Sequence, residues 1–365
     1  MALMQKLPTL LIIAMLAINS GIYTQHPEPL DPSPPDTPVK LIFIHHSTGG
    51  NWLADPSENE LGGELGKALM DNHYYVSATN YGWGINSIGD ATDIPNWLDW
   101  FSGERSEQYL KDLYSENGQN IGDFGSWPRL ADDPGGENEI ILFKSCFPNS
   151  DLEGRPDDPP AQEGWLSVSN AKYVYNEILK YFATRPDKLF IVITAPPLTS
   201  SRHSKNARAF NLWLVNDWLR ENSYAQANVA VFDFYNVLTG TDHHHRLVNG
   251  LVEHTYSSGH NTLAYPSEDD HPSREGNLKA TEEFIPLLNA WYNRWKSSFP
   301  ADNFLVTSVT QISTNPLTVE TDAPVISQVT ENTRTPTSDP NETGTESQKQ
   351  PAFCQTALIL PLTVL

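Results

Sequence analysis

The chain has 365 residues, which is enough for one large domain or two small ones. Its formal charge is −22, from 23 basic and 45 acidic residues, and no basic cluster interrupts the acidic background. Without such a cluster the chain lacks the electrostatic signature of a nucleic-acid-binding protein, so we expect no nucleic-acid partner. An acidic surface is typical of an extracellular protein and favours neutral ligands.

The first residues resemble a targeting segment rather than part of a fold. Residues 1–25 contain a lysine, an apolar core from Leu10 to Ile18 and small residues after it, a pattern typical of a secretory signal peptide. The core is too short for a comfortable membrane span. We expect cleavage near residues 20–25 and a secreted or cell-surface protein, with an uncleaved anchor as the alternative.

Composition divides the remainder into four segments. Residues 26–38 are a proline-rich linker, which should be extended and without a core. Residues 39–299 hold all 10 tryptophans and are expected to form the folded domain. Residues 300–350 are rich in Ser, Thr and Pro and are expected to be a disordered stalk. Residues 351–365 turn apolar again but are too few to cross a bilayer as a helix. They are either a processed tail that attaches the protein to a cell surface or a loosely attached terminus.

Apolar runs and amphipathic stretches alternate through the domain. An apolar run bounded by turn residues is typical of a buried strand, and a 3.6-residue period is typical of a helix. The pattern predicts strands over 41–45, 74–80, 139–146, 188–197 and 228–235, and helices over 64–72, 171–183, 206–220 and 277–296, the last kinked at Pro286. This order predicts a three-layer α/β/α sandwich with a five-stranded parallel sheet.

Four chemistry-bearing segments follow the predicted strands or precede the last helix. They are "HHSTGG" with Ser47, "TNYGWG" with two glycines, "KSCFPNSD" with Asn149, and "SEDDHPSREGN" with His271. In a parallel sheet such segments meet at the carboxyl edge, where ligands bind. Each also has a structural alternative: Ser47 as a helix cap, Asn149 as a turn residue and His271 as an ordinary loop residue.

The ordered set of four resembles the SGNH (GDSL-like) hydrolase superfamily over roughly residues 40–296. The resemblance implies that Ser47 is a nucleophile and His271 its general base. It also implies an oxyanion hole formed by the backbone amide of Ser47, the amide of Gly84 and the side chain of Asn149, with Gly82 as the less favoured glycine. A serine needs a base to become nucleophilic, and the tetrahedral oxyanion needs donors already in place. No cofactor is implied.

The acid that orients His271 is either Glu268 or Asp269. Glu268 has the family's spacing, whereas Asp269 has the family's side chain but is one residue closer. A helical turn would place residues three apart on one face and favour Glu268. An extended loop favours Asp269, and Pro272 biases His271 toward extended geometry. We therefore predict a contact from one of these acids, with Asp269 slightly ahead.

The resemblance thus points to a secreted serine esterase acting on a small-molecule or carbohydrate ester, such as an O-acyl group on a sugar. The family's usual Gly-Asp before the serine is replaced by His45 and His46. This change favours the alternative of a non-catalytic carbohydrate-binding or adhesion module. An O-acyltransferase, which would use a sugar hydroxyl in place of water, is the third hypothesis.

Neither the histidine run nor the cysteines predict a metal site or a disulfide framework. Residues 243–245 are three consecutive histidines, and consecutive residues rarely point at one ion, so we expect a solvated loop and no metal. The cysteines, Cys146 and Cys354, lie in very different contexts. We expect Cys146 to be a small packing residue at the end of a strand.

Overall fold

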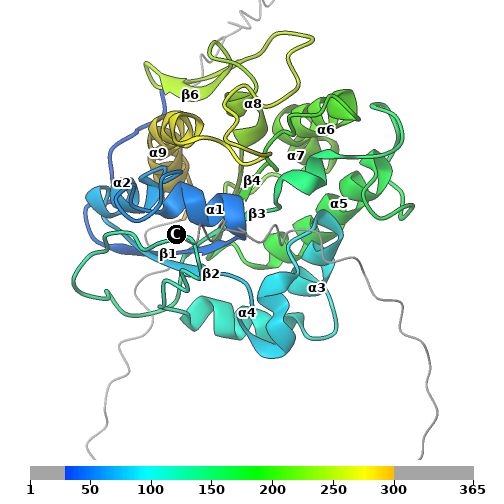
Figure 1. The fold of residues 1–365 in the computed structure, drawn as a ribbon. Coiled ribbons are helices and arrows are strands. Elements are labelled where there is room, and N and C mark those ends of the chain that lie inside the picture. Colours follow the sequence, from blue (N-terminus) through cyan, green and yellow to red (C-terminus); the bar gives the residue numbers. More distant parts are fainter. Residues whose placement is uncertain (1–28, 300–365) are drawn as a thin grey trace, which may run out of the picture.

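A computed structural model describes residues 29–299; the predicted signal peptide, stalk and C-terminal tail lie outside these residues. Five parallel strands form one sheet in the order β2-β1-β3-β4-β5 (Figure 1). The strands are β1 (Val39–Ile44), β2 (Tyr74–Thr79), β3 (Ile140–Lys144), β4 (Leu189–Ile193) and β5 (Val229–Phe232). The α-helices are α1 (Ser47–Leu53), α2 (Leu65–Asp71), α3 (Trp97–Phe101), α4 (Ser106–Ser115), α5 (Val168–Thr184), α6 (Ser204–Asn216), α7 (Trp218–Glu221), α8 (Phe234–Leu238) and α9 (Arg274–Ser297).

Helices cover both faces of the sheet, so the predicted three-layer architecture is confirmed. Successive side chains of a strand point to opposite faces. In β1, Leu41 and Phe43 pack in a core with α1, α2, α8 and α9, whereas Ile42 and Ile44 pack in a second core with α3 to α7. Both faces of the strand are buried, which explains why its sequence is a continuous apolar run.

The strand order places several loops at one edge of the sheet. β1 lies between β2 and β3, and its last residue, Ile44, is paired with Thr79 on one side and Phe143 on the other. The chain therefore leaves β1 at a point where the connections diverge to opposite sides of the sheet. Crevices at such points are the usual ligand sites of open α/β sheets.

Two details of the helices differ from the sequence-based expectation, whereas the helix expected over 277–296 is present as α9, with Pro286 inside it. The helix expected over 206–220 is interrupted at Asp217, which separates α6 from α7. No element was predicted between residues 81 and 138, where the chain forms α3, α4 and the 3₁₀ helices η1 (Ile85–Asp90) and η2 (Ile94–Asn96).

The prediction of a solvated loop at residues 243–245 is wrong. His244 and His245 belong to β6 (His244–Val248), which pairs with β7 (Leu251–Thr255) in an antiparallel hairpin. His243 and His245 are buried, because the hairpin packs on α8 and α9. Within residues 29–299 no group of His, Cys, Asp or Glu is arranged to hold a metal ion.

The described part of the proline-rich linker is fastened to the domain. The amide of Leu30 donates to the carbonyl of Gly250 at the tip of the hairpin, 2.8 Å away. Two side chains of α9 hold the next residues: Asn289 donates to the carbonyl of Pro32, and Asn293 donates to the carbonyls of Asp31 and Ser33. The described part of the linker is thus hydrogen-bonded both to the hairpin and to α9.

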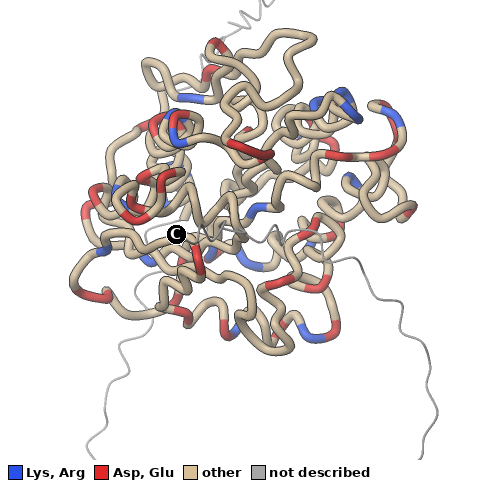
Figure 2. The backbone as a smooth tube through the Cα atoms, viewed as in Figure 1, with Lys and Arg blue, Asp and Glu red and all other residues tan. Residues whose placement is uncertain are grey.

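Figure 2 shows Lys and Arg positions interspersed with Asp and Glu positions along the backbone. No helix among the described residues has the length and apolar character that a membrane span requires.

Candidate active site

Ser47 is the first residue of α1, three residues beyond the end of β1. After the strand ends, His46 has extended backbone, and the helix begins at the next residue. His46 occupies the N-cap position, and no side chain caps the helix. The alternative that Ser47 or Thr48 serves as the helix cap is therefore wrong, and the Ser47 hydroxyl is free for other contacts.

The Ser47 hydroxyl is bound to the imidazole of His271, which lies 224 positions later in the chain. Ser47 Oγ is 3.1 Å from His271 Nε2. On the other side of the ring, His271 Nδ1 is 2.8 and 2.9 Å from the two carboxylate oxygens of Asp269. The ring of Phe147 meets the imidazole edge-on, with centroids 5.0 Å apart. Together these contacts fix the plane of the imidazole and its direction.

Of the two candidate acids, Asp269 is the one that contacts His271. Among the described residues Glu268 makes no hydrogen bond or ion pair, whereas Asp269 also accepts a hydrogen bond from the backbone amide of His271. The neighbouring Asp270 accepts from the amide and hydroxyl of Thr199 and ties the loop to the segment after β4. The loop is not helical, which is why the closer acid reaches the ring.

The charge of Asp269 fixes the proton on the imidazole. Partial burial acts to raise the pKa of Asp269, but hydrogen bonds from His271 and Ser267 outweigh it, so the pKa lies below its usual value. An ionised carboxylate can only accept, so Nδ1 carries the proton of a neutral ring. Nε2 is then the acceptor for the Ser47 hydroxyl.

Cys146 is a contact of Ser47 that the sequence did not predict. Its sulfur lies 3.1 Å from Ser47 Oγ and 3.3 Å from Thr48 Oγ1. The residue is buried beyond the end of β3. Because the Ser47 proton is directed to His271, the thiol is the donor toward Ser47 Oγ and a weak one.

The three expected oxyanion donors differ in how they are held. The Ser47 amide, at the first position of a helix, has no intrahelical acceptor. Gly84 has a φ of 75°, which only glycine adopts easily, and its amide makes no backbone hydrogen bond within the described residues. The amide of Gly82 instead donates to Asp90, which leaves Gly84 as the better candidate.

Asn149 lies in the 3₁₀ helix η3 (Phe147–Ser150), three residues after Cys146, and is buried. Its side-chain oxygen accepts from the backbone amide of Ile94, and its nitrogen donates to Asp93, both at 2.7 Å. Asn149 is therefore anchored to the loop between η1 and η2 rather than to the sheet alone.

The same loop holds the residue before Ser47. His46 Nε2 donates to the carbonyl of Gly89, and His46 Nδ1 accepts from the hydroxyl of Thr92. Burial lowers the pKa of His46, because it disfavours the charged ring, and the imidazole therefore stays neutral. The Tyr81 ring covers it, stacked at a centroid distance of 4.0 Å.

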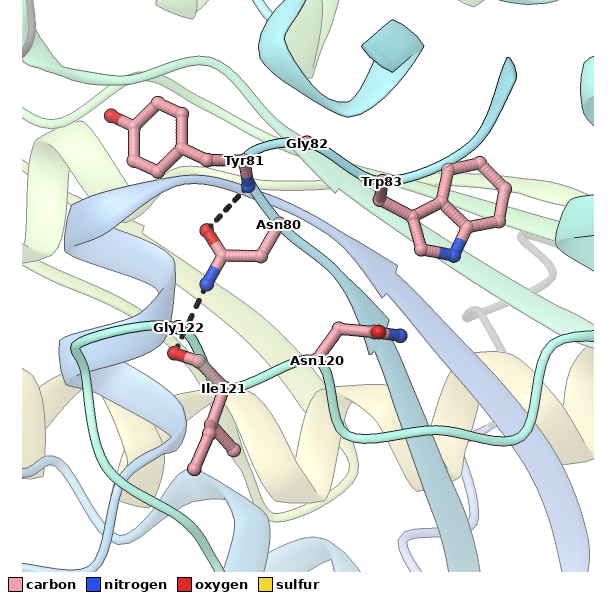
Figure 3. A pocket seen from close by; sticks show the side chains of 7 residues that line it. All are labelled: Asn80, Tyr81, Gly82, Trp83, Asn120, Ile121 and Gly122. Carbon is pink, nitrogen blue, oxygen red and sulfur yellow. Dashed lines mark hydrogen bonds between the residues drawn. The ribbon is translucent and has the colours of Figure 1, made fainter.

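A pocket of about 250 Å³ opens beside this stack. Its walls are the chain after β2 and the loop over residues 120–122 (Figure 3). The side chain of Asn80 ties the two walls together by accepting from the amide of Tyr81 and donating to the carbonyl of Ile121. The pocket is lined by amide side chains, aromatic rings and backbone: Asn80, Tyr81, Gly82, Trp83, Asn120, Ile121 and Gly122.

Comparison with known proteins gives only distant likenesses. No family model and no curated protein matches the chain. One similar solved structure is a carbohydrate esterase whose active site is described as having divergent catalytic and non-catalytic binding functions; it is 14% identical, with a TM-score of 0.34 over 72% of this chain and 68% of that chain. Another is a family two carbohydrate esterase from Clostridium thermocellum in complex with cellohexaose, 12% identical, with a TM-score of 0.34 over 73% of this chain and 66% of that chain. At such low scores the likeness supports no statement about the site or its activity.

Proposed function

We propose that the protein is a serine hydrolase of SGNH type that cleaves carboxylic esters, with Ser47 as the nucleophile, His271 as the general base and Asp269 as the orienting acid. The observation that carries the proposal is the continuous set of hydrogen bonds from Asp269 through His271 to Ser47. Residues far apart in the sequence form this arrangement at the carboxyl edge of a parallel sheet, where enzymes of this architecture bind substrate.

The chemistry follows from the contacts. Ser47 Oγ attacks the carbonyl carbon of the ester while its proton passes to His271 Nε2. The ionised Asp269 stabilises the imidazolium that forms. The developing oxyanion is bound by the amides of Ser47 and Gly84 and by Asn149. His271 then protonates the departing alcohol, and a water activated by His271 releases the acid from Ser47.

We assign the alcohol part of the ester to the pocket beside Tyr81. Amide groups and aromatic rings match the hydroxyl groups and the apolar faces of a sugar, and the acidic chain disfavours an anionic ligand. An O-acylated carbohydrate outside the cell is therefore the substrate class that we propose.

The test is hydrolysis of p-nitrophenyl acetate by the full chain and by matched variants. Ser47→Ala should abolish the activity and keep the fold, because it removes the nucleophile and little packing. Thr48→Val is the control, since its hydroxyl is adjacent but makes no contact with His271; it should hydrolyse the ester at a rate close to that of the wild type. Undiminished hydrolysis by Ser47→Ala would overturn the assignment. A folded wild type without activity would favour a binding module instead.

A further inference from the structure

The side chain of Asn149 is held in one orientation by two groups of opposite hydrogen-bonding character. The backbone amide of Ile94 can only donate, and it faces the side-chain oxygen at 2.7 Å. The carboxylate of Asp93 accepts, and it faces the side-chain nitrogen at 2.7 Å. A flipped carboxamide would place nitrogen against a donor and oxygen against a carboxylate, so the two contacts together exclude the flip.

One hydrogen of the Asn149 amide remains after this anchoring. The nitrogen carries two hydrogens, and Asp93 is the only acceptor that it has among residues 29–299. The residue itself is 2% exposed, so the second hydrogen has little access to water. A bound ester whose carbonyl becomes an oxyanion would supply the missing acceptor.

We infer that Asp93 is a positioning residue that orients the Asn149 amide toward the oxyanion; this inference rests on the proposed esterase function. Among the described residues Asp93 makes no hydrogen bond to Ser47 or His271 and contacts Asn149 instead. It belongs to the segment from η1 to η2, which also fixes His46 through Gly89 of η1 and Thr92 of the following loop, so one segment holds both Asn149 and His46. The loop is itself pinned, because the indole of Trp100 donates to the carbonyl of Ala91.

Asp93 acts by orienting the Asn149 amide and not through its own negative charge. A negative carboxylate near a developing oxyanion is unfavourable electrostatically, so its value lies in the hydrogen bond that it accepts. Asparagine at position 93 retains an oxygen that accepts the same bond, whereas alanine retains nothing. Asp93→Asn should therefore recover most of the turnover that Asp93→Ala loses.

The test compares kcat and KM for p-nitrophenyl acetate among Asp93→Ala, Asp93→Asn, Asn149→Ala and the double variant Asp93→Ala/Asn149→Ala. Asn149→Ala should lower kcat by about 10²–10³-fold, as for loss of one oxyanion donor. Asp93→Ala should lower kcat by about 10- to 100-fold with KM little changed, because the donor remains but is misplaced. The double variant should be no slower than Asn149→Ala, since Asp93 acts through that residue.

A matched control is Asp99→Ala, which removes an exposed carboxylate from the same region, next to Asn96. It should keep the wild-type kcat. Wild-type turnover in Asp93→Ala, or multiplied losses in the double variant, would overturn the inference while leaving the esterase function standing. If Asp93→Ala does not fold, the kcat of Asp93→Asn tests the inference in its place. A folded Asp93→Asn variant with a kcat as low as that of Asn149→Ala would contradict an orienting role. Failure of the esterase proposal is distinguishable, because the wild type itself would then be inactive.

Discussion

Replacing Asp269 by alanine removes the group that orients His271. Both oxygens of the carboxylate contact His271 Nδ1, at 2.8 and 2.9 Å, and one of them also accepts a hydrogen bond from the backbone amide of His271. A buried aspartate in this role is worth ~10⁴ in turnover. The Asp269 side chain is 47% exposed, so solvent can partly replace its charge. We therefore expect a smaller loss of kcat, about 10²–10³-fold, or ~3–4 kcal/mol in the activation free energy.

The matched control is Glu268→Ala, the adjacent acid that has no hydrogen bond or ion pair within the described chain. Steady-state hydrolysis of p-nitrophenyl acetate gives kcat for both variants, and thermal unfolding verifies that each is folded. Glu268→Ala should keep kcat within a few-fold of the wild type. Equal losses in the two variants, or a fully active Asp269→Ala, would refute the assignment of the orienting acid.

Three further predictions concern stability and substrate binding. Burial lowers the pKa of His45 to about 3, so between pH 6.5 and 3 the unfolded state binds a proton that the folded state does not, and stability falls as the pH falls. His45→Leu should reduce the loss of unfolding free energy between pH 7 and 5 by ~2 kcal/mol in urea titrations; an unchanged loss would contradict the burial argument. A protein of residues 39–299 should fold but be ~2–4 kcal/mol less stable than one of residues 29–299, because Asn289 and Asn293 lose three hydrogen bonds to linker carbonyls. Equal urea midpoints would contradict this prediction. Tyr81→Ala should raise KM for an acetylated oligosaccharide more than KM for p-nitrophenyl acetate. Equal changes in the two KM values would contradict the assignment of the sugar subsite to the pocket beside Tyr81.

The sheet could be predicted from the sequence because its strands are buried on both faces. The continuous apolar run that ends at Ile44 has no other common explanation when turn residues bound it. The short elements after β2 gave no such signal. Asn86 and Ser87 have positive φ, and α3 covers only 5 residues, which is too short for a helical period to be recognised. Tertiary contacts of Trp97 and Trp100, not local propensity, stabilise this region.

The hairpin β6–β7 was predictable but missed. Asn249 and Gly250 have φ of 52° and 77°, and Asn-Gly between two short apolar stretches is a strong short-range hairpin signal.

The candidate site, like the fold, could be predicted from the sequence only in part. Ser47 and His271 follow from their places at the ends of elements, and two acids near His271 were evident. The choice of Asp269 depended on the geometry of a loop, which sequence spacing alone does not determine. Asp93 and Thr92 carry no sequence signal, because their contacts with the site arise only when distant loops meet at the edge of the sheet. Cys146 lies in a segment that the sequence singled out, but its contact with Ser47 was not predicted.

The central claim is that Ser47 is an activated nucleophile, and covalent labelling tests it most directly. The full chain is treated with a fluorophosphonate probe, and the modified peptide is identified by mass spectrometry. A single modification on Ser47, greatly slowed in His271→Ala, is the result that the proposed mechanism predicts. Modification of another residue, or none on a folded protein, would contradict it.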